Sequence, residues 1–154
     1  MVALDKVDLS ILRVLQSDGR ISTTKVAEQL SLSETPCWRR QKRLEADGYI
    51  EGYQAIVSRR KLDLGVLSFI QLKISLHSQA SLNKIESTLS AHPNVMFCHK
   101  VTGDADYLLQ VVAKDLDEYG KFVTDIFGNL PGITAINSNI SLQEIKSSSR
   151  FPIY

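Results

Sequence analysis

The chain of 154 residues is 44% hydrophobic and 23% charged, which excludes a disordered chain and allows one or two folded domains. No apolar run approaches the roughly 18 residues of a membrane span, and no signal peptide is recognised, so we expect a cytoplasmic protein with reduced cysteines. The histidines and cysteines lack the spacing of metal ligands, so no metal is expected.

The net charge of +1 conceals an uneven distribution along the chain. Residues 1–61 carry 11 basic and 8 acidic residues, whereas residues 62–154 carry 7 and 9. A polyanionic partner such as double-stranded DNA is therefore expected for the first part only.

Two short helices are predicted before residue 31. Asp5 is expected to cap the first helix, and Asp18-Gly19 to end it. Ser22 is expected to cap the second helix, in which the small Ala27 allows a close helix crossing. Their apolar stripes comprise Leu4, Val7, Ile11, Leu12 and Leu15 in the first helix and Val26, Ala27 and Leu30 in the second.

A basic helix is predicted over residues 34–47. Ser33 is a suitable N-cap whose side chain would accept a first-turn N–H, Pro36 falls in the first turn, and Gly48 is a plausible C-cap. At 100° per residue, Cys37, Gln41 and Leu44 share one side. The other side carries Thr35, Trp38, Arg39, Lys42, Arg43 and Ala46.

The short connection between the second and third helices predicts a helix-turn-helix. A narrow apolar stripe with a basic outer face suits the major groove, although a charge run can also be only a solvated surface. We assign Arg39 to a guanine edge, and expect Arg40 and Arg43 to hold phosphates or to brace the helix against Glu45. The candidate DNA-binding residues are Ser33, Thr35, Trp38, Arg39, Arg40, Lys42 and Arg43.

Residues 49–57 alternate between apolar and polar and are predicted to form strands, as a small wing or a connector. Residues 58–65 read as a linker, in which solvated charge is favoured over phosphate contact for Arg59, Arg60 and Lys61. We therefore divide the chain into a DNA-binding domain, residues 1–61, and a second domain, residues 62–154.

The second domain is predicted to have the order βαββαβ. Strands are expected at 66–77, 95–101, 107–113 and 133–145, with helices around residues 82–89 and over 116–130. This order predicts a ferredoxin-like sandwich, so the whole chain belongs to the α+β class. One face of the sheet is left without helices, and a second subunit is expected to cover it.

A polar loop joins the two central strands. The amides around Gly103 could hold a carboxylate, and Asp104 or Asp106 an ammonium group, as an amino acid requires. Gly-Asp is also ordinary hairpin chemistry, and from these residues alone that interpretation is favoured. The candidate effector-binding residues are Thr102, Gly103, Asp104, Asp106 and Tyr107.

Short motifs lie along essentially the whole chain, at residues 4–8, 18–20, 36–40, 43–45, 48–50, 101–107, 130–133 and 145–146. Together they resemble the Lrp/AsnC family of transcriptional regulators. The resemblance implies a winged helix-turn-helix, a ligand-sensing domain, dimers that often assemble into octamers, and amino-acid effectors bound between subunits near Gly103, Asp106 and Tyr107. Gln41 departs from the family, which usually has an aliphatic residue there, so this side chain needs a polar partner or else loosens the packing of the helix.

Three functions follow from these patterns. The favoured one is a sequence-specific DNA-binding regulator that responds to an amino acid and needs no cofactor. The alternative is an architectural protein that condenses DNA as a multimer, with little sequence choice and no effector; the modest charge of residues 1–61 disfavours it. An enzyme is disfavoured because no spacing places a histidine or cysteine with Asp104 and Asp106.

Overall fold

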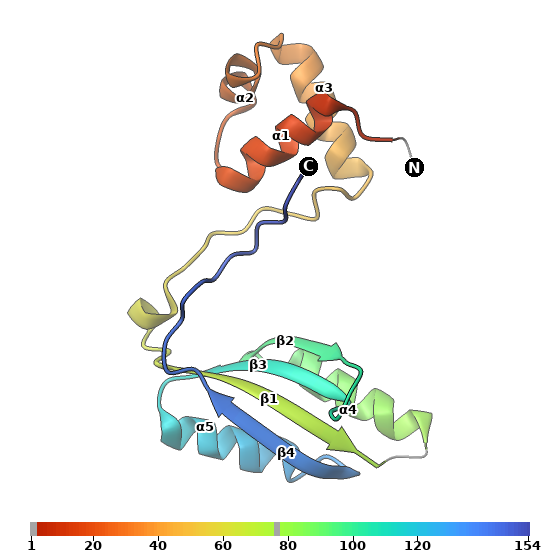
Figure 1. Cartoon of the computed structure of the whole chain (residues 1–154), viewed down its shortest axis with the longest axis vertical. Coiled ribbons are helices and arrows are strands. Elements are labelled where there is room, and N and C mark those ends of the chain that lie inside the picture. Colours follow the sequence, from red (N-terminus) through yellow and green to blue (C-terminus); the bar gives the residue numbers. More distant parts are fainter. Residues whose placement is uncertain (1–2, 76–77) are drawn as a thin grey trace. The chain divides into compact units, whose positions relative to one another are not determined.

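The computed structural model describes residues 3–75 and 78–154, which form two compact units (Figure 1). The first unit extends to Ile56 and also includes Lys146–Tyr154, and the second is Val57–Ile145. The chain therefore leaves the first unit once and returns to it at its C-terminal end. Within the described ranges, no helix is long and apolar enough to cross a membrane.

The first unit is built from three helices, α1 (Lys6–Ser17), α2 (Thr23–Gln29) and α3 (Glu34–Ala46). Each helix contributes two residues to one buried cluster, so the predicted apolar stripes meet in a common core. The cluster comprises Ile11, Leu15, Val26, Ala27, Cys37 and Leu44.

The helix ends follow the sequence with one exception. Asp5 and Asp8 form a reciprocal capping box at the start of α1, and the Ser22 side chain accepts the Lys25 N–H at the start of α2. Ser33 is the N-cap residue of α3, but its side chain makes no capping hydrogen bond, so that predicted contact is wrong. Gly48 follows α3 with a φ of 76°, which ends the helix as predicted.

The turn between α2 and α3 is closed by the main chain. Ser31 has a φ of 54°, and the Leu32 N–H donates to the Ala27 carbonyl at 2.8 Å. The Thr24 hydroxyl also donates to Glu34 Oε1 at 2.8 Å, which joins α2 to the first turn of α3. The predicted helix-turn-helix is therefore present. Its second helix, α3, is held by its buried residues and by the hydrogen bond at its first turn.

The strands predicted over residues 49–57 are wrong. Residues 51–58 are irregular throughout, because a strand needs a hydrogen-bonded neighbour and no described segment pairs with them. A short 3₁₀ helix, η1 (Arg59–Leu62), follows, and Arg59 donates to the carbonyls of Leu64 and Gly65. This part of the chain is a connector, as the alternative interpretation had it.

The second unit contains a four-stranded antiparallel sheet with two helices. The strands lie in the order β2-β3-β1-β4, as the split βαββαβ pattern predicts. The elements are β1 (Val66–Ile74), α4 (Gln79–Ala91), β2 (Val95–Lys100), β3 (Tyr107–Ala113), α5 (Leu116–Phe122), a π-helical turn η2 (Val123–Phe127) and β4 (Ile133–Ile140).

Several elements end earlier than predicted. The strand expected at 66–77 ends at Ile74, and its last two positions, Leu76 and His77, lie outside the described residues. The strand expected at 133–145 ends at Ile140 because β1, its neighbour, begins at Val66 and offers no further ladder beyond the Ser141–Leu67 bond. The helix expected at 116–130 becomes π-helical at Val123.

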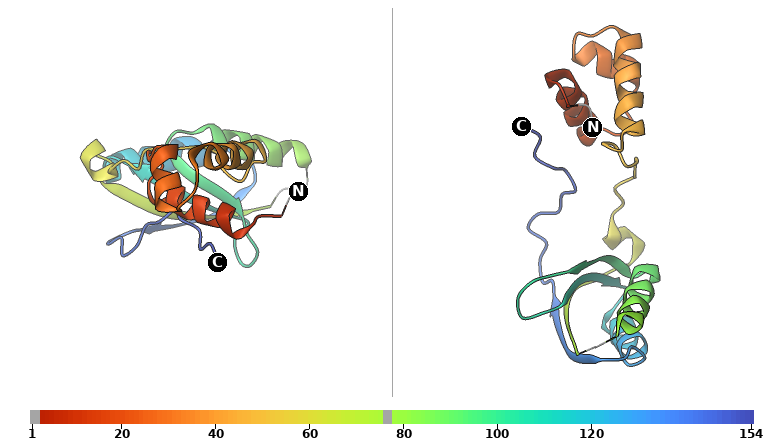
Figure 2. Two further views of the ribbon diagram at one scale, coloured as in Figure 1. Left: turned by 90° about the horizontal axis from the view of Figure 1, so that it is seen from above. Right: turned by 90° about the vertical axis from the view of Figure 1, so that its right-hand side faces the viewer.

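Both helices cover the same face of the sheet (Figure 2, right). Ile70 of β1, Leu109 of β3 and Ile85 of α4 are fully buried in the core between these layers. On the opposite face, Phe69 and Phe97 are half-buried, with ring centroids 6.5 Å apart. The second unit therefore has an aromatic face that its own helices do not cover.

Candidate nucleic-acid interface and ligand cavity

α3 presents two faces of opposite character. Cys37 and Leu44 are fully buried against α1 and α2. Thr35, Arg39 and Lys42 are exposed on the other side, and Trp38 leaves 52% of its surface in solvent. Trp38 therefore lies beside two exposed basic side chains, and the major groove accommodates a helix face of this kind.

A buried carboxylate holds the other two arginines of α3. Asp8 is 1% exposed, and its two oxygens accept from Arg40 Nη1 at 2.9 Å and Arg43 Nη2 at 2.5 Å. Arg40 also donates to Asp5 Oδ2 at 2.6 Å. The predicted brace exists, but its acceptor is on α1; the prediction of Glu45 as the partner is wrong. Arg40 and Arg43 are therefore held against α1, whereas Arg39 and Lys42 lie on the exposed side of α3.

Glu45 belongs instead to a polar chain along the other edge of α3. Its carboxylate accepts from Lys42 Nζ at 2.6 Å and from the Tyr53 hydroxyl at 3.0 Å. Gln41 donates to the same hydroxyl at 3.0 Å and accepts from Thr23 at 3.1 Å, which confirms that this residue needs a polar partner. The contact with Lys42 lowers the pKa of Glu45, and burial raises the pKa of Tyr53.

The loop between β2 and β3 is divided between exposed and anchored residues. Thr102, Gly103 and Asp104 are exposed, and Gly103 has a φ of 110° that other residue types rarely adopt. Asp106 is anchored, because its Oδ2 accepts the Ile74 N–H at 2.7 Å. Tyr107 is 3% exposed, so its ring belongs to the core and only its hydroxyl reaches outward.

A cavity of about 280 Å³ lies beside this loop. Lys100 and Asp106 supply opposite charges to it, on an otherwise mainly apolar wall. Such a combination suits a small zwitterion with an apolar side chain. The lining residues are Ile74, Leu82, Lys100, Val101, Asp106 and Tyr107.

Glu86 of α4 fixes the cation of this cavity. Its Oε1 accepts from Lys100 Nζ at 2.5 Å and from the Tyr107 hydroxyl at 2.7 Å. The contact with Lys100 lowers the pKa of Glu86, whereas burial, and then Glu86, raise the pKa of Tyr107. Sequence reasoning missed both Glu86 and Lys100; the available signal was a lysine at the end of the strand that leads into the loop.

A second cavity, of about 400 Å³, shares Lys100 and Tyr107 with the first. Glu86 and Cys98 also line it, together with two serines of α4. Burial raises the pKa of the Cys98 thiol, which disfavours the reactive thiolate. The polar groups around Lys100 thus form one connected region on the helix-covered side of β2 and β3.

A helix-turn-helix with an outward cationic face, joined to an α+β unit with a charged cavity, defines a ligand-responsive DNA-binding regulator. Residues 4–51 match the model of winged helix-turn-helix DNA-binding domains, and residues 67–151 match that of the Lrp/AsnC ligand binding domain. The chain belongs to the Lrp/AsnC family of transcriptional regulators.

Two transcriptional regulators are similar to this chain over almost its whole length. The Bkd operon transcriptional regulator of Pseudomonas aeruginosa is 38% identical over 99% of this chain and 100% of its own length. The leucine-responsive regulatory protein of Klebsiella pneumoniae is 34% identical over 97% of this chain and 92% of its own length.

Solved structures of the family have the same fold. A transcriptional regulator from Neisseria meningitidis, in complex with L-methionine, is 34% identical, with a TM-score of 0.93 and 97% of each chain covered. An AsnC family transcriptional regulator from Agrobacterium tumefaciens is 32% identical, with a TM-score of 0.92 and the same coverage. The α+β fold with a helix-turn-helix is therefore confirmed.

Proposed function

We propose that this regulator reads a specific DNA sequence with the exposed face of α3. The separation of its cations carries this proposal: Asp8 holds Arg40 and Arg43, while Arg39 and Lys42 extend outward. Arg39 reads a guanine edge, and Thr35 and Trp38 make further contacts to the groove.

The remaining candidate residues of α3 position the helix on the phosphates. Ser33 is exposed at the N-terminus of α3, and its side chain is not used for capping. Its hydroxyl and the helix N-terminus together suit a phosphate. Arg40 and Arg43 are 30% and 38% exposed beside Asp8, so their outer edges reach the DNA backbone without leaving the brace.

The proposed effector is an amino acid with an apolar side chain, bound in the cavity beside the 102–107 loop. Lys100 pairs with its carboxylate and Asp106 with its ammonium group, while Ile74 and Leu82 face its side chain. The exposed loop residues Thr102, Gly103 and Asp104 are proposed to contact the effector from outside the cavity, and Tyr107 lines the cavity itself. The L-methionine complex of the Neisseria relative supports this class of ligand.

Assembly is the third part of the proposal. A second copy covers the sheet face that carries Phe69 and Phe97, which gives a homodimer, and dimers assemble further into an octamer. The effector is also proposed to lie between subunits, which requires that the helix-covered side of β2 and β3, where its cavity lies, faces another subunit of the octamer. Two copies of α3 in a dimer read two half-sites on the DNA.

Competition and ligand binding test this function together. The protein is used to select DNA from a random pool, and the selected duplex is then challenged with unrelated DNA. We expect at least a thousandfold preference for the selected duplex, and a raised melting temperature with an apolar amino acid. Equal competition and no shift with any of the twenty amino acids would support the architectural alternative.

We further propose that the protein acts by binding, without a catalytic step, in the cytoplasm where bacterial DNA lies. The family of transcriptional regulators supports this assignment. Turnover of an amino acid by the purified protein would contradict it.

A further inference from the structure

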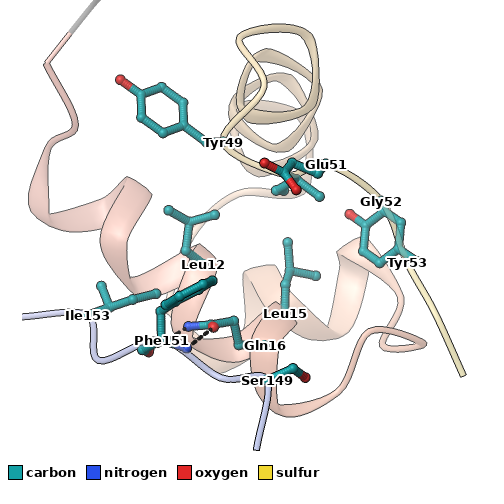
Figure 3. A pocket seen from close by; sticks show the side chains of 11 residues that line it. Leu12, Leu15, Gln16, Tyr49, Glu51, Gly52, Tyr53, Ser149, Phe151 and Ile153 are labelled. Atoms are coloured by element: carbon teal, nitrogen blue, oxygen red, sulfur yellow. Dashed lines mark hydrogen bonds between the residues drawn. The ribbon is translucent and has the colours of Figure 1, made fainter. Parts of the chain in front are cut away.

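A groove on the first unit is occupied by the end of the chain itself (Figure 3). One wall comes from α1, with Leu12, Leu15 and Gln16, and another from residues 49–53. Residues 149–153, here called the C-terminal segment, line the remaining side. A cavity of about 470 Å³ remains among these walls, so the segment does not fill the groove completely.

The Gln16 side chain forms two hydrogen bonds with the main chain of Phe151. Its Oε1 accepts the Phe151 N–H at 2.7 Å, and its Nε2 donates to the Phe151 carbonyl at 3.1 Å. One side-chain amide therefore satisfies the donor and the acceptor of a single peptide residue, in the way a neighbouring strand does. This paired contact requires an extended segment at a fixed register.

The next residues of the segment strengthen this geometry. Arg13, one helical turn before Gln16, donates from Nε to the Ile153 carbonyl at 3.1 Å. Pro152 disfavours a helical conformation at Phe151 and so prepares the extended form. α1 thus presents two side chains, spaced to contact alternate residues of an extended peptide.

Side-chain burial contributes little to this contact. Phe151 remains 80% exposed, and Ile153 is only partly buried. Recognition through a few main-chain hydrogen bonds is weak between separate molecules, but a short tether supplies an effective concentration in the millimolar range. The connection from β4, residues 141–148, provides that tether, so the segment can be held and still be released.

We propose that the groove between α1 and residues 49–53 is a peptide-binding site whose ligand is the C-terminal segment of the same chain. Its occupation gives the DNA-binding unit a second attachment to the effector-binding unit, by way of β4, besides the connector before β1. This inference is independent of which effector binds and of how α3 reads DNA.

Hydrogen exchange in the full-length protein tests the contact directly. We expect the Phe151 amide to exchange at least tenfold more slowly than in a free peptide of residues 146–154. Gln16→Leu, which keeps an apolar helix former on α1, should raise the exchange rate to that of the peptide. Gln29→Ala, at an exposed glutamine of α2, is the matched control and should leave protection unchanged.

Trypsin provides a second readout, because Arg150 precedes Phe151 within the docked segment. Cleavage after Arg150 should be at least fivefold faster in Gln16→Leu than in wild type or Gln29→Ala. Exchange of Phe151 at the free-peptide rate in the wild type would overturn the proposal, whether or not the variant folds. Equal cleavage in a folded Gln16→Leu and the wild type would also overturn it.

Discussion

Arg39 and Arg40 are neighbours in the sequence with different surroundings. Arg40 is paired with Asp5 and Asp8, whereas Arg39 lies on the exposed side of α3 with Trp38. A helix turns 100° per residue, and this turn carries Arg40 away from the exposed side and toward Asp5 and Asp8. Composition alone makes all four cations of α3 equivalent, but their contacts divide them.

Arg39→Ala should cost about 1–3 kcal/mol at the specific site and relax the base preference at one position. Arg39 supplies a fork of donors that an alanine lacks, while the helix and its core are unchanged. Fluorescence anisotropy with the selected duplex and with variants of each base pair measures the effect. An equal loss on specific and random DNA would show that Arg39 contacts only phosphate.

Asp8→Asn should lower the free energy of unfolding by about 3 kcal/mol, because it leaves two partly buried arginines without their carboxylate. The change also disrupts the capping box of α1. Urea unfolding measures the loss, and Glu28→Gln, at an exposed carboxylate of α2, is the control. Equal stability of the two variants would show that the brace contributes nothing.

Among the elements, α4 has one carboxylate that forms polar contacts with the sheet, in addition to its apolar packing. Glu86 of α4 contacts Lys100 of β2 and Tyr107 of β3, and the contact with Lys100 lowers its pKa below the ordinary value of 4.5. A carboxyl group with a lowered pKa in the folded state stabilises the fold above its ordinary pKa. That contribution is lost as the pH falls through the lower value.

Glu86→Gln should therefore lower the melting temperature at pH 6, and the difference from the wild type should shrink progressively as the pH falls below 4.5. Thermal unfolding of both proteins across this range gives the comparison. Glu144→Gln, at an exposed residue beyond β4, should not reproduce the pH-dependent difference. A difference between wild type and Glu86→Gln that stays constant from pH 6 to pH 3 would contradict the assignment.

Local patterns predicted most elements, and long-range contacts account for what they missed. The period of the apolar residues places α1, α3 and β3 within a residue or two, and Gly48 marks the end of α3. The residues 49–57 have strand-like alternation but no partner in the described chain, so propensity alone was misleading.

The candidate sites also divide into residues that local spacing predicted and residues that only long-range contacts bring together. The outer face of α3 follows from helical spacing, whereas the Asp8 brace joins residues 32 and 35 positions apart. The Gln16–Phe151 pair is separated by 135 positions and has no sequence signature. Lys100 and Glu86 meet only because β2 and α4 pack together, so the cation of the cavity required the fold.

At the scale of the whole molecule, the sheet face with Phe69 and Phe97 is the proposed interface between copies. Phe69→Asp should dissociate the dimer, because it introduces a charge into the apolar centre of that face. Sedimentation velocity measures the change. Asn83→Asp on α4 adds the same charge on the helix-covered side and is the control. An unchanged mass for Phe69→Asp would place the interface elsewhere.

The central claim is that an amino acid in the cavity beside residues 102–107 changes DNA binding by α3. The most direct measurement is the affinity for the selected duplex with and without L-methionine or L-leucine, in wild type and in Lys100→Ala. We predict a change of fivefold or more in the wild type, its loss in Lys100→Ala, and a matching change in amino-acid affinity when DNA is bound. The same DNA affinity with and without every amino acid, in a protein that binds its duplex specifically, would contradict the account.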